Sequence, residues 1–231
     1  MTQKSRVVVF DLDDTLYKEQ DYLQSSYREI AGKIESQYAL KGVFDRMLRW
    51  WQEGENVFQR LIGYCQQSTF NSQPSLTLDN LLAIYRSHVP AIRLDEETKC
   101  LLDRLYQYAV LGLITDGRSL TQRHKIEALG LSAYMDERDI LISEEMGFEK
   151  PSKAAYRHFM ERYPSYTYYY IGDNPAKDFV APNHLGWTTV CLLDDGRNIH
   201  QQDFCLSQEM LPQHNISHLS EIENIIIPLT H

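Results

Sequence analysis

The chain lacks any apolar run close to the roughly 18 residues that a membrane-spanning helix needs. Its first ten residues, MTQKSRVVVF, hold an apolar run that is too short for a secretory signal peptide. These two absences predict a cytoplasmic protein without a membrane partner.

Cysteine is also scarce, and no two cysteines form a CxxC pair. Wide and irregular spacing argues against a disulfide scaffold or a zinc ribbon, so we expect reduced thiols. None of the eight histidines forms a metal-ligand pair on a shared face. The four cysteines are Cys65, Cys100, Cys191 and Cys205.

Positive charge is in deficit, with 23 Lys and Arg against 32 Asp and Glu and a net charge of −9. A surface of this charge does not recruit a nucleic acid polymer or an anionic membrane. A site for a small anion therefore has to be built locally. The composition does not specify an oligomeric state.

What the chain does contain is enough apolar material, 43% of its residues, for a sizeable core. Five short apolar runs lack strict polar alternation, which is typical of strands covered on both faces. Helix-like stretches separate them, so the region from about residue 93 onward predicts an α/β fold, a parallel sheet with right-handed crossovers. The five runs are Arg6–Leu12, Ala109–Thr115, Asp139–Ser143, Tyr168–Gly172 and Thr188–Leu193.

Residues 17–92 differ because they show helical periodicity and no convincing strand. One apolar stripe begins at Leu23 and ends at Tyr38, and a second includes Leu81 and Tyr85. The turn-rich residues 66–77 separate the predicted helices. We expect a helical insertion here, and we expect the last apolar run, residues 222–229, to close or pack on a sheet edge.

The first apolar run leads directly into Asp11, Asp13 and Asp14. Crowded carboxylates repel one another and lose hydration, so a positive charge is expected among them. Polar residues also follow the next three runs, and the carboxyl ends of parallel strands meet at one edge of a sheet. These residues are Thr115 and Asp116, then Lys150, then Asp173 and Asp178.

These four clusters, DLDDT, the Thr of LITDG, the Lys of EKPS and the acidic pair of GDNPAKD, occur in that order. In this the chain resembles the haloacid dehalogenase superfamily, specifically its phosphatases with a helical cap inserted after the first strand. The resemblance implies a Rossmann-like core formed by residues 1–16 and 93–231 and a helical cap domain formed by residues 17–92.

The resemblance also implies roles for individual residues. Asp11 would be the nucleophile that forms an aspartyl-phosphate, and Asp13 would protonate the leaving group and later activate water. Thr115, the Asp116 amide and Lys150 would bind the phosphoryl oxygens, with Thr115 and Lys150 counted as catalytic.

Mg²⁺ is the cofactor that the resemblance implies, because this ion prefers oxygen ligands. The expected ligands are the Asp11 carboxylate, the Asp13 backbone carbonyl and Asp173, with Asp178 as a further ligand or a neighbouring acid. Structural alternatives remain for several residues of these clusters. Asp13, Asp14, Asp173 and Asp178 could cap helices or turns. Thr115 could merely end a strand, and Lys150 could be a solvated surface charge.

The predicted function is hydrolysis of a small soluble phosphomonoester, either a sugar phosphate or a nucleotide. Dehalogenases and phosphonatases of the superfamily lack the acid at the position of Asp13. A phosphomutase, or a silent binding protein that keeps the fold, remains an alternative. In the insertion, Trp50 and Trp51 are candidates for stacking on a base or sugar, although two tryptophans on a helix are more often core residues.

Overall fold

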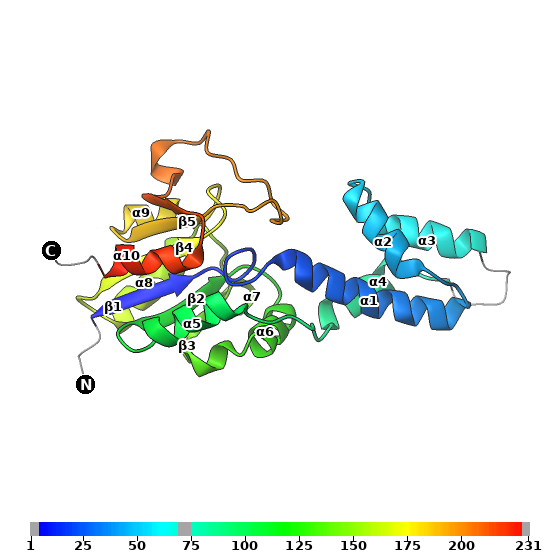
Figure 1. Cartoon of the computed structure of the whole chain (residues 1–231), viewed down its shortest axis with the longest axis horizontal. Helices are drawn as coiled ribbons and strands as arrows, with labels where there is room; N and C mark the ends of the chain where they lie inside the picture. The colour runs from blue at the N-terminus through cyan, green and yellow to red at the C-terminus, as the bar shows by residue number, and fades with distance from the viewer. Residues whose placement is uncertain (1–4, 69–74, 228–231) are drawn as a thin grey trace. The chain divides into compact units, whose positions relative to one another are not determined.

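A computed structural model describes residues 5–68 and 75–227 of the chain. Its centre is a six-stranded sheet in the order β3-β2-β1-β4-β5-β6, and every neighbouring pair is parallel (Figure 1). The predicted α/β fold is therefore confirmed. The strands are β1 (Arg6–Phe10), β2 (Val110–Thr115), β3 (Met135–Ile142), β4 (Thr167–Gly172), β5 (Thr188–Leu192) and β6 (His214–Ile216).

All five apolar runs form strands, whereas β6 was not expected. Only one of the three residues of β6, Ile216, is buried, so this edge strand has no apolar run to mark it. The run at residues 222–229 begins as a helix, and residues 228 and 229 lie outside the described residues.

Helices join the strands and cover both faces of the sheet. The α-helices are α5 (Glu96–Leu105), α6 (Ser119–Ala128), α7 (Ser143–Met146), α8 (Lys153–Arg162), α9 (Val180–His184) and α10 (Ile222–Ile226). Three short 3₁₀ helices are η1 (Leu131–Ala133), η2 (Gln208–Met210) and η3 (Leu219–Glu221). A bidentate pair between Arg104 and Glu223, at 2.8 Å between Nη2 and Oε2, joins α5 to α10.

One face of the sheet packs on α8. Val7 and Val9 of β1 share an apolar cluster with Phe159 of α8. The approach is close because β2 carries Gly112, where an added Cβ would lie 2.4 Å from the Phe159 ring. On the same face Tyr168 stacks on Trp187 with ring centroids 5.0 Å apart, so the tyrosines of β4 serve core packing. This packing holds β1, β2 and β4 in register, and their carboxyl ends form the edge described below.

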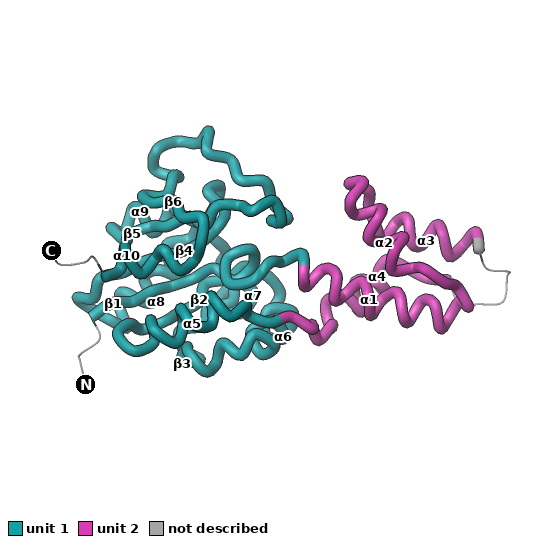
Figure 2. The backbone as a smooth tube through the Cα atoms, in the orientation of Figure 1, with its two compact units in different colours: residues 1–20, 93–231 teal, residues 21–92 magenta. Residues whose placement is uncertain are grey.

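The insertion after β1 is helical. It comprises α1 (Glu19–Tyr38), α2 (Val43–Gln52), α3 (Val57–Ser68) and α4 (Leu78–Ser87). The predicted stripe on α1 is buried, and α4 begins with a capping box in which Thr77 and Asn80 exchange hydrogen bonds. The chain divides into two compact units, residues 1–20 with 93–231 and residues 21–92 (Figure 2).

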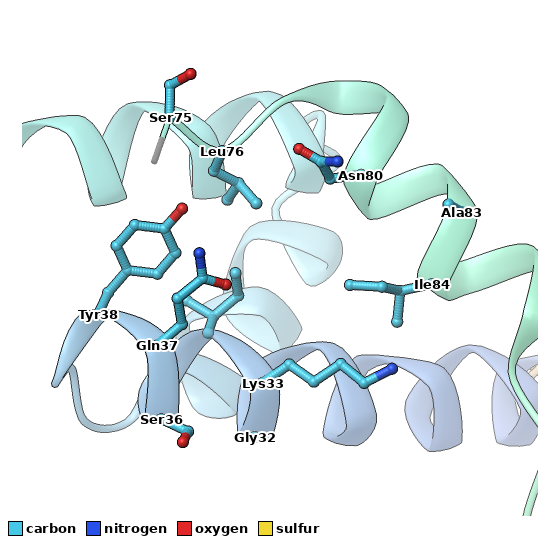
Figure 3. A pocket seen from close by; sticks show the side chains of 11 residues that line it. Gly32, Lys33, Ser36, Gln37, Tyr38, Ser75, Leu76, Asn80, Ala83 and Ile84 are labelled. Carbon is cyan, nitrogen blue, oxygen red and sulfur yellow. The ribbon is translucent and has the colours of Figure 1, made fainter. Parts of the chain in front are cut away.

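A groove in the second unit lies between α1 and α4 (Figure 3). Its described lining mixes apolar side chains such as Ile84 with amides such as Gln37 and one cation, Lys33, and it includes no carboxylate.

Within the described parts of the chain, no helix combines the length and apolarity that crossing a bilayer requires.

Candidate active site

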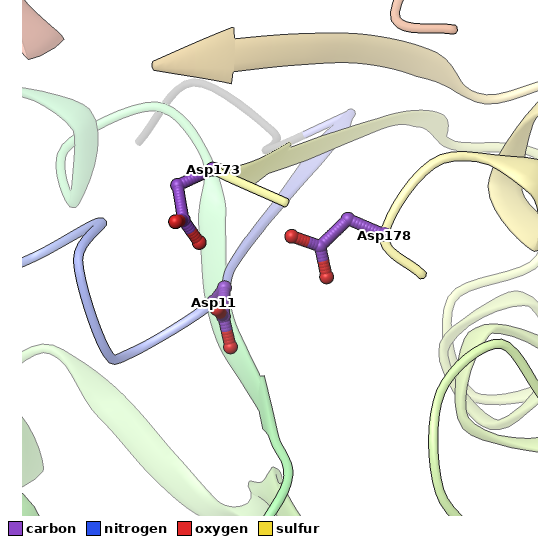
Figure 4. A group of neighbouring side chains, drawn as sticks. All are labelled: Asp11, Asp173 and Asp178. Carbon is purple, nitrogen blue, oxygen red and sulfur yellow. The ribbon is translucent and has the colours of Figure 1, made fainter. Parts of the chain in front are cut away.

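Three buried aspartates meet at the carboxyl edge of the sheet. Asp11 follows β1 and Asp173 follows β4, while Asp178 comes from the turn after Asp173 (Figure 4). Each offers a carboxylate oxygen within 4.8 Å of the other two. The last paired residues of β1 and β4 are Phe10 and Ile171, so Asp11 and Asp173 both lie within two residues of this pair. The Asp11 amide donates to the Ile171 carbonyl at 2.8 Å.

Lys150 is the cation among these carboxylates. Its Nζ donates to Asp11 Oδ1 at 2.7 Å and to Asp178 Oδ1 at 2.8 Å, and its side chain is almost fully buried. Burial alone would lower the pKa of Lys150, but the charges of Asp11 and Asp178 outweigh it and hold the pKa well above its ordinary range. Lys150 is therefore a fixed positive charge.

One lysine does not neutralise three carboxylates. Burial, reinforced by the charges of the neighbouring aspartates, raises the pKa of Asp173 to about 8. Burial likewise raises the pKa of Asp11 to about 6, although Lys150 opposes the shift. Asp11 and Asp173 thus have pKa values above the ordinary range, as expected for acids that are crowded together without a further positive charge.

The donors suit a hard divalent cation, since all three are carboxylate oxygens. The fold makes room for them: Gly172 ends β4 where an added Cβ would lie 2.5 Å from Asp178 Oδ2. Asp178 is held in that space by the Asn174 amide, which donates to Oδ2 at 2.9 Å. Asp11, Asp173 and Asp178 therefore form a buried group of carboxylates that could hold a metal ion.

Thr115 and Asp116, the residues at the end of β2, reach the same edge. The Thr115 hydroxyl oxygen accepts a hydrogen bond from Gln122 Nε2 at 2.8 Å. The Asp116 carboxylate accepts from the Lys150 amide at 3.1 Å and lies 3.5 Å from Lys177 Nζ. The Asp116 carboxylate thus holds the segment that carries Lys150. The predicted phosphate contact concerns a different group of the same residue, its backbone amide.

Asp13 lies beside this group in a network of its own. Its Oδ1 accepts from Lys125 Nζ at 2.6 Å and from the Tyr17 hydroxyl at 2.5 Å, and its Oδ2 accepts from Gln122 Nε2 at 3.0 Å. Burial raises the pKa of Asp13, but the Lys125 charge and these hydrogen bonds outweigh it, so the pKa lies below its ordinary value. The Asp13 carboxylate is not part of the three-aspartate cluster, and the role of its backbone carbonyl as a metal ligand stays a prediction.

Asp14 has a structural role. It adopts a positive φ of 56°, its Oδ1 accepts from the Glu19 amide at 2.9 Å at the start of α1, and its Oδ2 accepts from the Ile199 amide at 2.9 Å. Both oxygens are thereby used by backbone donors, as the capping alternative predicted.

Several contributions to the edge were not predicted, among them those of α6 and of the segment after β5. Gln122 and Lys125 come from α6, where polar side chains usually face solvent, and Asn198 comes from the segment after β5 and donates to Asp173 Oδ2 at 3.1 Å. One sequence feature could have indicated Gln122 and Lys125. They lie three residues apart on a helix that follows the LITDG motif, so both side chains lie on one face of that helix. Asn198 lies in a segment without periodicity, and nothing in the sequence marks it.

Asp11, Asp13 and Thr115 are among the residues that line a pocket with a volume of about 140 Å³ at this edge. Since one liquid water takes up about 30 Å³, that volume suits a phosphoryl group with a few waters. The lining comprises Asp11, Asp13, Asp14, Glu19, Thr115, Asp116, Asp173, Asn174, Lys177 and His200.

Residues 8–192 match the family model of the haloacid dehalogenase-like hydrolases. The chain belongs to this family. Within it, the chain is an enzyme of the phosphatase type. The match extends from β1 through β5, so it includes all four clusters at the sheet edge and the inserted helices.

Two relatives with assigned activities are enzymes that act on phosphate esters. A glyceraldehyde 3-phosphate phosphatase of Methanocaldococcus jannaschii is 27% identical over 202 residues, which cover 80% of this chain and 84% of that protein. The pyrimidine 5'-nucleotidase YjjG of Escherichia coli is 28% identical over 129 residues, or 54% of this chain and 53% of that one.

Among solved structures, the hydrolase YfnB of Bacillus subtilis bound to magnesium superposes with a TM-score of 0.62 at 21% identity. The alignment covers 97% of this chain and all of that one. At this identity the likeness shows the fold, a parallel α/β core with a helical insertion after its first strand.

Proposed function

We propose that the protein is a Mg²⁺-dependent phosphomonoester hydrolase that acts on a small sugar phosphate or nucleotide through an aspartyl-phosphate on Asp11. The observation that carries the proposal is the buried group of Asp11, Asp173, Asp178 and Lys150 at the carboxyl edge of the sheet. A phosphate dianion cannot approach three carboxylates unless a further cation is present.

In the first step an Asp11 oxygen attacks phosphorus and the bond from phosphorus to the ester oxygen breaks. Lys150 and the Thr115 hydroxyl stabilise the equatorial oxygens. Asp13, which has to take up a proton before this step because its pKa lies below the ordinary value, gives that proton to the departing alkoxide. Asp11 is suited to attack because its backbone is fixed in the sheet, while Lys150 holds one of its oxygens.

In the second step Asp13 takes a proton from water, whose oxygen attacks phosphorus. The bond from phosphorus to Asp11 breaks, and inorganic phosphate leaves. Two carboxylates two residues apart thus perform nucleophilic and acid–base work separately.

The residues that would hold Mg²⁺ are Asp11, Asp173 and the Asp13 backbone carbonyl, with Asp178 as a direct ligand or a neighbour that orients Lys150. When bound, the ion supplies charge neutralisation at the phosphoryl oxygens.

Support for a small substrate comes from the pocket and from the relatives. A volume of about 140 Å³ suits a phosphoryl group. The names of the two relatives specify a triose phosphate and pyrimidine nucleotides, so both substrate classes belong in the test. Asp13 argues against dehalogenase chemistry, since that chemistry has no use for an acid at this position.

The test is a panel of sugar phosphates, nucleoside monophosphates and an aryl phosphate, assayed with and without Mg²⁺. We expect Mg²⁺-dependent release of inorganic phosphate from at least one class. Phosphate release that persists in excess EDTA would contradict the metal assignment. Conversion of a sugar phosphate to its isomer without phosphate release would favour a phosphomutase.

A further inference from the structure

Lys125 is a buried lysine that the proposed reaction does not use. Only 4% of its side chain is exposed, and its Nζ lies 2.6 Å from Asp13 Oδ1 and 3.8 Å from Glu19 Oε1. Burying an ammonium group costs several kcal/mol before its partners compensate, and a buried ion pair is often no more stabilising than apolar packing of the same volume. Stability alone therefore does not account for a lysine at this position.

Gln122, one helical turn earlier on α6, contacts the same aspartate from another side. Its Nε2 lies 3.0 Å from Asp13 Oδ2, 2.8 Å from Thr115 Oγ1 and 2.8 Å from the Asp116 carbonyl oxygen. One amide group thus links the Asp13 carboxylate to the end of β2, where the predicted phosphate contacts lie.

The Tyr17 hydroxyl completes the set, since it donates to Asp13 Oδ1 at 2.5 Å. Three donors therefore fix both oxygens of a carboxylate that also lines the pocket. A freely rotating aspartate would sample several rotamers and meet the leaving-group oxygen only part of the time.

We propose that Lys125 and Gln122 are positioning residues that hold the Asp13 carboxylate toward the leaving-group oxygen. The inference rests on the proposed function, because it assumes that Asp13 transfers the proton. Neither side chain needs to touch the substrate, and both act through Asp13.

The experiment compares Lys125→Met with the native chain on two substrates, an aryl phosphate and the best alkyl phosphate of the panel. An aryl oxide leaves readily without a proton, whereas an alkoxide does not. We expect Lys125→Met to lower kcat for the alkyl ester about 100-fold, within the usual contribution of a general acid, and to lower kcat for the aryl ester less than about tenfold. Lys125→Arg, which keeps a donor, should recover part of the loss.

A second arm repeats Lys125→Met in an Asp13→Asn background. A residue that acts only through Asp13 has nothing further to lose there, so the added substitution should change the residual aryl rate less than about twofold. The matched control is Glu127→Gln, at an exposed position of the same helix, which should keep both rates.

Equal losses on the two esters, or a loss that persists in the Asp13→Asn background, would overturn the inference and make Lys125 a packing residue. If Lys125→Met does not fold, Gln122→Met is put through the same two arms and decides by the same outcomes. A native chain that releases phosphate from no ester refutes the proposed function instead. If the native chain is active and Asp11→Asn is inactive, the proposed function stands. An equal loss on the aryl and alkyl esters in Lys125→Met would then refute only the inference about Lys125.

Discussion

Each of the two units contains a polar network, and the two networks differ in burial and in balance. In residues 21–92, the Ser25 hydroxyl lies 2.8 Å from His88 Nε2, and His88 Nδ1 bonds to the Glu29 carboxylate. The Ala91 amide donates to Ser25 Oγ at 2.9 Å, and Lys33 pairs with Glu29 at 2.5 Å. Each of these groups has a partner of opposite charge or complementary hydrogen bonding.

In the sheet unit the buried carboxylates outnumber the cations beside them, and the pKa of Asp173 is raised to about 8 by burial and by its acidic neighbours. The overall charge follows the same division. Residues 21–92 hold equal numbers of basic and acidic side chains, so the whole net charge of −9 falls on the other unit.

The difference separates a structural network from a ligand site. A closed network such as that of His88 stabilises its own unit, whereas the aspartate cluster costs free energy until a ligand balances it. Ser25, His88 and Glu29 have the residue types of a hydrolytic triad. However, Ser25 and Glu29 lie on the same helix, and an amide already donates to the hydroxyl oxygen that would attack. We therefore assign this network to joining the segment after α4 to α1.

The largest expected difference is between the same carboxylate-to-amide substitution made at Asp11 in the sheet unit and at Glu29 in the helical unit. Asp11→Asn should lower turnover of every phosphate ester by about 10⁴-fold or more, because an amide is a poor nucleophile. It should also leave no hydroxylamine-sensitive phosphoenzyme after a quench. Glu29→Gln is the matched control and should keep turnover of a small phosphate. Substantial turnover by Asp11→Asn would move the nucleophile elsewhere.

The next prediction concerns stability and has opposite signs in the two networks. Asp173→Asn removes a repelled carboxylate, so it should raise the melting temperature of the metal-free protein by about 2–4 °C for each kcal/mol gained. It should also reduce the stabilisation that added Mg²⁺ confers on the native protein. Glu29→Gln should lower the melting temperature instead. Melting curves with EDTA and with Mg²⁺ measure both, and a destabilised metal-free Asp173→Asn would contradict the account of an unbalanced cluster.

Much of the sheet unit could be predicted from the sequence, because its signals are local. Buried parallel strands need continuous apolar runs, so β1 to β5 were visible, and acids directly after Phe10 and Gly172 fall at one sheet edge by topology alone. The proximity of Lys150 followed from the family motif.

The contributions that were missed depend on tertiary contacts. Gln122 and Lys125 look like solvent-facing residues until α6 packs against Asp13, and Asn198 reaches Asp173 from an irregular segment. His88 gave no signal because its partners on α1 lie about 60 residues earlier in the chain. The catalytic and ligand roles assigned to the site residues stay predictions that the experiments above address.

A smaller effect is expected from opening the closed network. Ser25→Ala leaves the Ala91 amide and His88 Nε2 without this partner, and the loss of such partly exposed hydrogen bonds costs about 0.5–1.5 kcal/mol. Urea unfolding measures it, with Ser36→Ala on the exposed side of the same helix as the control. Because the network is structural, kcat for a small phosphate at a temperature where both variants are folded should not change. A lower kcat with unchanged stability would instead give Ser25 a role in the reaction.

The smallest expected effect tests whether the insertion selects the substrate. Trp50 is anchored within its own unit, since its ring lies 6.2 Å from Tyr64 and Arg60 lies over it at 5.8 Å, whereas Arg49 is exposed and Trp51 is half-buried. We expect Trp51→Ala and Arg49→Ala to change the ratio of kcat/KM between a nucleotide and a sugar phosphate by up to about tenfold, the range that single pocket contacts give. Turnover of acetyl phosphate, which offers little beyond its phosphoryl group, should stay the same.

Trp50→Ala should mainly lower the melting temperature, because it removes packing between α2 and α3. If Trp51→Ala and Arg49→Ala slowed all substrates equally, the residues that select the substrate would have to be sought in the sheet unit, beginning with Lys177 and His200 of the pocket.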